Sequence, residues 1–257
     1  MNKFLGGLLE PFKALRKNPG ISGTILLLDI CFIASFLILQ NLFGLLAASI
    51  SISSFGSAVF AFTAMSALYY AILISAYSFF KLNILFCCSN LYGKPKNNSH
   101  KLLNFTILNL LIALIFFGIM LFFNFIFGGL KPNAQIGLFF AVAPFYLIYL
   151  YASTQLSHSY FIRDPYAINA LKKGMSSVFS NFRKLKNAFY FSLLCILSSA
   201  LLFFIAGYGL KAAYSGNNIG YISAYSNFRN ISVIYFYLMV YFMNFINRIY
   251  FFDAVKK

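Results

Sequence analysis

Side chains able to do acid–base or metal chemistry are scarce in this sequence. Only four of its 257 residues are acidic, against twenty that are Lys or Arg, and it has two histidines, His100 and His158. General acid–base catalysis and metal binding need such groups close together. The two histidines instead lie in separate segments, and neither has a pair of carboxylates nearby in the sequence. We therefore predict no catalytic residue and no metal site.

The common catalytic motifs are also missing. The sequence has no phosphate-binding glycine loop, no Gly-x-Ser-x-Gly turn, no His-Glu-x-x-His helix and no Cys-x-x-Cys pair. Its four cysteines lie within apolar runs or at their ends, a placement that does not support a disulfide framework. We therefore expect a protein that is not an enzyme and that holds no cofactor.

One acidic residue lies inside an apolar run. Asp29 is about seven residues, or about 10 Å of helix, from the start of that run. A charge at this depth in a membrane needs a partner. Lys81, on the next apolar segment, is the nearest candidate, and Arg248 is the other. A structural pair that holds helices in register is our leading interpretation, and a proton or ion relay is the alternative.

The composition places these residues in a membrane protein. Hydrophobic residues make up 61% of the chain and charged residues only 9%, whereas ordinary soluble domains carry roughly a quarter charged residues. The formal charge of +16 must face something anionic. Because the basic residues flank apolar spans, we expect the partners to be membrane lipids with anionic headgroups, and we expect no nucleic acid.

A basic amphipathic helix is predicted over residues 164–186, between two apolar spans. Its apolar stripe repeats every three or four residues, as one face of a helix does, and comprises Ile168, Leu171, Met175, Val178, Phe182 and Leu185, with Phe189 continuing it into the fifth span. The cations on its other face are predicted to contact lipid headgroups at the inner membrane surface: Lys172, Lys173, Arg183, Lys184 and Lys186. A second helix of this kind is predicted over residues 1–21.

Six apolar segments are long enough to cross a membrane as helices. We place the spans at about residues 22–48, 57–82, 103–127, 135–159, 187–207 and 231–252. Three similar units, each a basic segment followed by a helical hairpin, favour a bundle of three hairpins. The prediction is therefore an all-α polytopic membrane protein that forms a single transmembrane domain over residues 1–257, with the two amphipathic helices preceding the first and fifth spans.

The distribution of charge sets the predicted orientation. With these spans, seventeen Lys and Arg residues fall on one side of the membrane and three, Lys131, Lys211 and Arg229, on the other. The positive-inside rule then puts both ends of the chain in the cytoplasm, with the protein in the cell membrane. The longest outer loop is expected at residues 208–230, where tyrosines would lie at the membrane interface.

Two basic segments carry a resemblance to a known family. The run from Asp164 to Lys184, with Ala170-Leu171-Lys172 ahead of a hairpin, and the run from Phe12 to Pro19 resemble uncharacterised six-helix membrane domains of archaea and bacteria. Such domains look like the membrane portion attached to some glycerophosphodiester phosphodiesterases. The resemblance implies the six-helix fold. It carries no catalytic residue, because the phosphodiesterase domain with its acidic metal ligands has no counterpart in this chain.

Two functions follow from these features as hypotheses. Short loops, absent catalytic groups and the basic helix favour a non-enzymatic integral membrane protein that binds or organises lipid. Asp29, Pro144 and the polar residues within the spans favour instead a small permease or transporter subunit.

Overall fold

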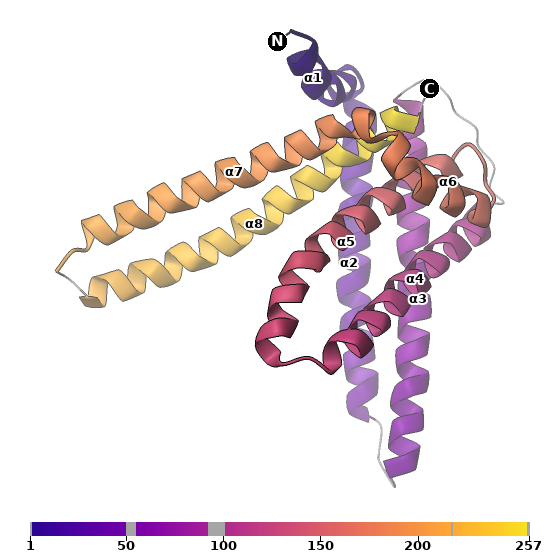
Figure 1. Cartoon of the computed structure of the whole chain (residues 1–257), viewed down its shortest axis with the longest axis horizontal. Coiled ribbons are helices and arrows are strands. Elements are labelled where there is room, and N and C mark those ends of the chain that lie inside the picture. The colour runs from indigo at the N-terminus through magenta and orange to yellow at the C-terminus, as the bar shows by residue number, and fades with distance from the viewer. Residues whose placement is uncertain (1, 50–54, 92–100, 217, 256–257) are drawn as a thin grey trace. The chain divides into compact units, whose positions relative to one another are not determined.

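The computed structural model of the chain describes residues 2–49, 55–91, 101–216 and 218–255 (Figure 1). Within these ranges every regular element is a helix, so the all-α prediction is confirmed. The helices are α1 Asn2–Lys17, α2 Pro19–Ser49, α3 Phe55–Asn90, α4 Leu102–Gly128, α5 Pro132–Phe161, α6 Ala167–Ser180, α7 Phe182–Ala213 and α8 Asn218–Val255.

Six of these helices, α2, α3, α4, α5, α7 and α8, are long and apolar enough to cross a membrane. Consecutive members pack together in pairs, α2 with α3, α4 with α5 and α7 with α8. The chain is therefore a multi-pass membrane protein whose six spans form three hairpins, as predicted. The two shorter helices, α1 and α6, precede the first and fifth of these spans.

Prolines begin two of the helices, α2 and α5. Asn18 alone separates α1 from α2, and Pro19 then occupies the first position of α2. Pro132 likewise begins α5 after Lys131, whose backbone is extended. Proline suits these positions because the first residues of a helix need no amide hydrogen for intrahelical bonding.

The contacts group into two compact units. The larger unit comprises residues 15–180 and holds α2 to α6, and the smaller unit comprises residues 1–14 and 181–257 and holds most of α1 with α7 and α8. We predicted one membrane domain over the whole chain. The two units are described separately below.

In the larger unit, side chains are buried mainly at one end. There the start of α2, the end of α3, the start of α4 and the end of α5 come together, and α6 packs across α5 and α4. Figure 1 shows the α4–α5 hairpin inclined to α2 and α3. The largest fully buried apolar side chains of this unit are Ile25, Leu85, Phe105, Leu108, Leu156 and Phe161. Most apolar side chains farther along the helices are exposed, as membrane-spanning surfaces require.

The contact of α6 with α5 depends on one glycine. A Cβ atom on Gly174 would lie 2.6 Å from the backbone nitrogen of Ser157 and 2.7 Å from its Cα. Both distances are too short for any real side chain, and the opposing atoms are backbone. Close approach of the two helices therefore requires glycine at this position, as in other tightly packed membrane helices.

In the smaller unit, α7 and α8 form a long hairpin. Asn247 Nδ2 donates a hydrogen bond to Ser192 Oγ at 2.8 Å across this pair. Phe12 of α1 makes ring contacts with Phe191 of α7 and Phe242 of α8, with centroids 5.8 and 6.3 Å apart. These contacts attach the first helix to the last two, although they are far apart in the sequence.

The predicted outer loop at residues 208–230 is wrong. Helix α7 continues to Ala213 and α8 begins at Asn218, so most of the segment is helical. It contains no proline, and each glycine in a helix costs only about 1 kcal/mol, less than leaving several backbone groups unbonded. The chain turns at Gly216, whose φ of 91° favours glycine.

Candidate functional site

A cavity lies among α2, α3, α4 and α5 in the larger unit, and we call it the apolar cavity. Its volume is about 520 Å³, within the range of ligand sites in proteins. Eight of its eleven lining side chains are hydrocarbon: Phe32, Phe36, Leu73, Ile74, Ile112, Ala113, Phe116 and Leu150.

Three lining residues carry polar groups, namely Tyr77 of α3, Asn109 of α4 and Thr154 of α5. Asn109 belongs to the part of α4 that includes Phe105 and Leu108, both fully buried, so this helix end is firmly packed. The amide of Asn109 therefore lies where the apolar cavity meets the buried core. An apolar cavity with a few fixed polar groups can bind the hydrocarbon part of a molecule and orient its polar part.

A chain of hydrogen bonds holds the side chain of Asn109. We call it the polar chain: Ser78 of α3, Asn109 of α4 and His158 of α5. Asn109 Nδ2 donates to Ser78 Oγ at 2.9 Å, and His158 Nε2 lies 2.7 Å from Asn109 Oδ1. Ser78 and His158 are fully buried, and Asn109 is 7% exposed. Interhelical bonds of this kind stabilise helix association in lipid and fix side-chain orientations.

The hydrogen bonds of the polar chain also determine which atoms of Ser78, Asn109 and His158 carry the shared hydrogens. Ser78 Oγ donates its hydrogen to the carbonyl of Ile74 at 2.6 Å, so toward Asn109 it acts as an acceptor. The amide nitrogen of Asn109 therefore faces Ser78, and its oxygen faces His158. An amide oxygen only accepts hydrogen bonds, so His158 carries a hydrogen on Nε2. Rings of Tyr77 and Phe105 lie 6.3 and 5.1 Å from the His158 ring.

Asp29 and Lys81, the ionisable residues predicted to pair, lie at the same end of the larger unit. Both are buried, with 5% and 4% exposure, on α2 and α3, which pack together. Lys81 Nζ donates a hydrogen bond to Gln155 Oε1 of α5 at 3.3 Å. One helical turn separates Asp29 from Phe32, which lines the apolar cavity. Pairing of Asp29 with Lys81 stays a prediction, and the other predicted partner, Arg248, belongs to the smaller unit.

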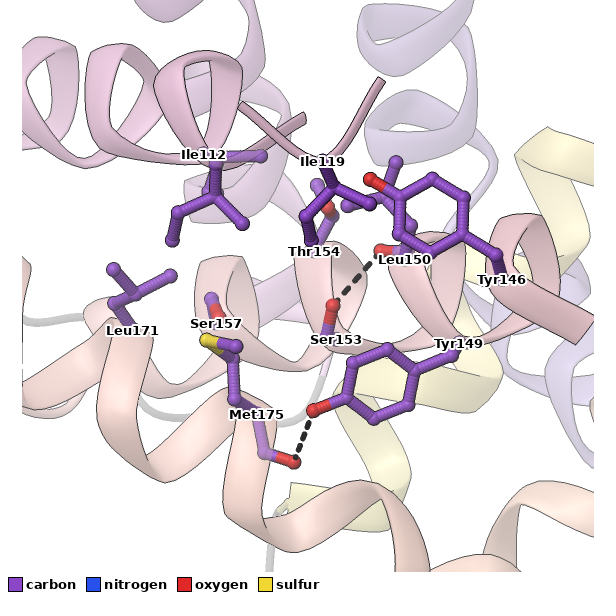
Figure 2. A pocket seen from close by; sticks show the side chains of 11 residues that line it. Ile112, Ile119, Tyr146, Tyr149, Leu150, Ser153, Thr154, Ser157, Leu171 and Met175 are labelled. Atoms are coloured by element: carbon purple, nitrogen blue, oxygen red, sulfur yellow. Dashed lines mark hydrogen bonds between the residues drawn. The ribbon is translucent and has the colours of Figure 1, made fainter. Parts of the chain in front are cut away.

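A second, smaller cavity lies under α6, between α4 and α5 (Figure 2). Its volume of about 30 Å³ has room for one or two water molecules. Ser157 Oγ and Tyr146 Oη line it, and neither has a hydrogen-bond partner within the described part of the chain. Tyr149 reaches across to α6, where its hydroxyl donates to the carbonyl of Met175 at 3.3 Å.

The apolar stripe predicted on the amphipathic helix packs partly against protein. Val178 is 7% exposed, and Leu171 and Met175 line the small cavity beneath α6. By contrast, Ile168 is 71% exposed. The single helix predicted over residues 164–186 is wrong in its extent, because α6 ends at Ser180 and α7 begins at Phe182. The stripe residues Phe182, Leu185 and Phe189 therefore belong to α7.

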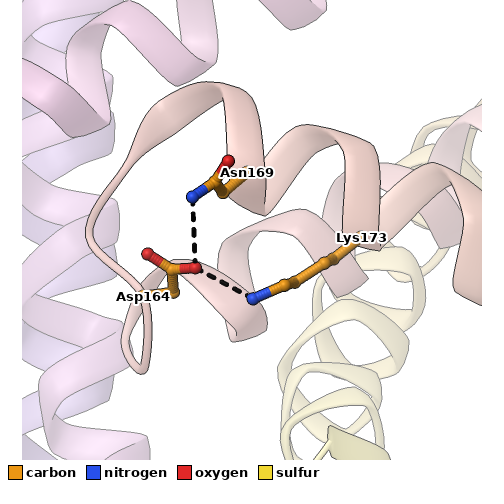
Figure 3. Close-up of polar contacts among 3 residues, drawn as sticks. All are labelled: Asp164, Asn169 and Lys173. Carbon is orange, nitrogen blue, oxygen red and sulfur yellow. Dashed lines mark hydrogen bonds and ion pairs between the residues drawn. The ribbon is translucent and has the colours of Figure 1, made fainter.

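The predicted headgroup-binding cations are on the surface where their side chains are described. Lys172, Lys173 and Lys186 are exposed, while the side chains of Arg183 and Lys184 lie outside the described part of the structure. Lys173 Nζ forms an ion pair with Asp164 at 2.9 Å, and Asn169 donates to the same carboxyl oxygen (Figure 3). The hydrogen bond from Lys173 lowers the pKa of the Asp164 carboxyl below its usual value. Contact of these cations with lipid stays a prediction.

Sequence reasoning missed the polar chain. The polar residues within the spans were considered only as a group, and His158 only as a metal ligand or catalytic group. Among the described residues, no three His, Cys, Asp or Glu side chains gather as a metal site would require. The relevant signal was the presence of three polar residues near the same predicted end of consecutive spans, at positions 78, 109 and 158.

Comparisons of the chain with models of protein families, with characterised proteins and with solved structures gave no match. The resemblance to membrane domains attached to glycerophosphodiester phosphodiesterases therefore stays a prediction, and the argument for function depends on the site itself.

Proposed function

We propose that this chain is a non-enzymatic integral membrane protein that binds membrane lipid, with an acyl chain in the apolar cavity. The apolar cavity is the observation that carries this proposal. It has a volume of about 520 Å³, lies among helices apolar enough to cross a membrane, and is lined mainly by hydrocarbon side chains. An acyl chain is the abundant hydrophobic ligand in that environment.

The basic surface supports the same proposal. Lys172 and Lys173 of the larger unit would contact anionic headgroups while the acyl chain occupies the cavity, each cation near the membrane surface contributing about 1 kcal/mol. Arg183, Lys184 and Lys186 of the smaller unit would contact headgroups in the same way. This arrangement assumes that the protein lies in the cell membrane with both ends of the chain in the cytoplasm. This orientation is predicted by the positive-inside rule, because cations are in excess in the segments that flank the spans on one side.

Filling the cavity tests the proposal. Ala113 lines the cavity, whereas its neighbour Leu114 is 57% exposed. We expect Ala113→Phe to weaken phospholipid binding at least about tenfold, because a phenyl ring would take the place of the acyl chain; tenfold corresponds to about 1.4 kcal/mol. The measurement is the number of phospholipids retained per protein in native mass spectrometry of the purified chain.

Leu114→Phe is the matched control, since it adds a ring on the exposed side of the same helix. Equal lipid retention by Ala113→Phe and Leu114→Phe would count against the apolar cavity as the binding site.

A second candidate function is transport. The observation that favours it is the burial of two ionisable residues, Asp29 and Lys81, on helices that line the cavity. Intramembrane ionisable residues often mark ion or proton pathways. Under this alternative, Asp29→Asn would abolish a proton-coupled flux in proteoliposomes while the protein stayed folded. Absence of any such flux in the unaltered protein would leave lipid binding as the function supported by the cavity.

A further inference from the structure

We propose that the amide of Asn109 binds the ester carbonyl of the lipid in the apolar cavity, and that Ser78 and His158 act as positioning residues for that amide. The inference depends on the proposed function and adds a chemical requirement to it. The bound lipid must offer a hydrogen-bond acceptor at the end of its acyl chain. A hydrocarbon chain without a carbonyl would fill the same cavity but would lose this contact.

The first step is the fixed orientation of the amide. Ser78 Oγ uses its only hydrogen on the Ile74 carbonyl, at 2.6 Å, and accepts from Asn109 Nδ2 at 2.9 Å. His158 Nε2 holds the amide oxygen at 2.7 Å. A rotation of the amide by 180° would put its oxygen against an acceptor and its nitrogen against a donor. Asn109 is therefore held in one orientation.

The second step is the hydrogen that remains. A carboxamide nitrogen has two hydrogens, and one of them is used on Ser78. Asn109 lines the apolar cavity, where most neighbouring side chains have no group that could accept the other hydrogen. The amide thus offers a donor to an occupant of the cavity. Its matching group is a carbonyl or another neutral acceptor.

The third step is depth in the membrane. Helix α4 has 27 residues and is thus about 40 Å long, about 10 Å more than the hydrocarbon core of a bilayer. If the helix is centred, each end extends about 5 Å beyond that core. Asn109 is seven residues from Leu102, or about 10 Å from the helix start, and so lies about 5 Å inside the edge of the core. Ester carbonyls of membrane lipids lie at that edge, within a short displacement of the amide.

The test compares two lipids that differ only in the carbonyl. One is a diacyl phosphatidylcholine, and the other is the dialkyl ether analogue with the same headgroup and chain length. Binding of each to the purified full chain is measured by native mass spectrometry. We expect the ester lipid to bind about three to ten times more tightly, the range that one net hydrogen bond provides.

Three variants locate the preference. Asn109→Leu should bring the ester-to-ether ratio to about one, because it removes the donor. His158→Phe should do the same, since the amide is then free to rotate, while His158→Gln, which can still donate to the amide oxygen, should keep the preference. Asn124→Leu is the matched control: it makes the same substitution at an exposed position of α4 outside the cavity lining.

The outcomes separate this inference from the function on which it depends. Equal binding of the two lipids by the unaltered protein would overturn the carbonyl contact and leave acyl-chain binding in place. Binding of neither lipid would overturn the proposed function itself. Tighter binding of a free fatty acid than of the ester lipid would overturn the assignment to membrane lipid. Because the ester and ether lipids are compared in the unaltered protein, the carbonyl contact is tested even where a variant fails to fold.

Discussion

At the scale of single residues, the larger unit buries the ionisable side chains of Asp29 and Lys81. Asp29 and Lys81 are both nearly inaccessible, and Lys81 also bonds Gln155. Charges at such positions are tolerated when each has partners, and removing one partner leaves the other charge in a medium of low dielectric constant. A substitution that leaves a buried charge without its partner should therefore cost more stability than one that removes a charge.

We predict that Lys81→Ala lowers the free energy of unfolding by about 3–5 kcal/mol, the cost of leaving a buried charge without its partner. Asp29→Asn should cost less, because the amide can still accept a hydrogen bond. The expectation requires that Asp29 and Lys81 are partners. Reversible unfolding of each variant in mixed micelles with increasing SDS measures both values, and the opposite ranking would refute the pairing.

The surface carboxylate Asp164 provides a prediction about pH. Its pKa is lower in the folded protein because Lys173 donates a hydrogen bond to it. A lowered pKa stabilises the fold above the unfolded value of 3.8, and this contribution is lost as the pH falls through the folded value. For an exposed pair it amounts to at most about 1 kcal/mol. Asp164→Asn should therefore be less stable than the unaltered protein at pH 7, and the difference should disappear in the same unfolding assay once the pH is below the lowered pKa of Asp164.

At the scale of the elements, the small residues of α6 determine how closely it approaches α5. Ala170 is fully buried, and Gly174 lies against the backbone of Ser157. The helix is amphipathic in sequence, yet part of its apolar side is used for packing within the chain. Among the apolar side chains of α6, Ile168 and Phe179 are left exposed and can make other contacts.

Gly174→Ala should destabilise the larger unit by about 1–3 kcal/mol, since the added methyl group would push α6 away from α5. Gly118→Ala in α4 is the matched control, because nothing lies within 4 Å of a Cβ at that position. There the same substitution should stabilise the helix by up to about 1 kcal/mol. Proteolysis within the links that flank α6 reports its detachment. Equal effects of the two substitutions would contradict the close contact.

At the scale of the whole molecule, the remaining prediction concerns orientation in the membrane. Single cysteines at Asn133 and Ser215 should react with an impermeant thiol reagent added outside intact cells. Cysteines at Lys17 and Lys172 should react only after the membrane is opened. The background lacks the four native cysteines, at positions 31, 87, 88 and 195. The reverse labelling pattern would invert the topology that the charge count predicts.

The sequence alone determined the number and type of the spans. Hydrophobicity summed over about twenty residues is a local property, and in a membrane it suffices to specify a helix, because no other open structure satisfies the backbone. The helix ends were predicted less well: the first amphipathic helix was expected over residues 1–21, but α1 ends at Lys17 and Pro19 already begins α2. The prediction failed at residues 208–230, where polar composition was taken for a loop although no residue there prevents a helix.

Only the tertiary structure brought Ser78, Asn109 and His158 together and left the apolar cavity beside them. Each residue turns the helix by about 100°, so a side chain's direction depends on the rotation of the whole helix about its axis. Spans that are apolar on every side give no sequence pattern from which that rotation can be read. The rotation is decided instead by packing, through contacts such as that of Gly174 with Ser157 and through bonds between polar groups that have no other partner in lipid.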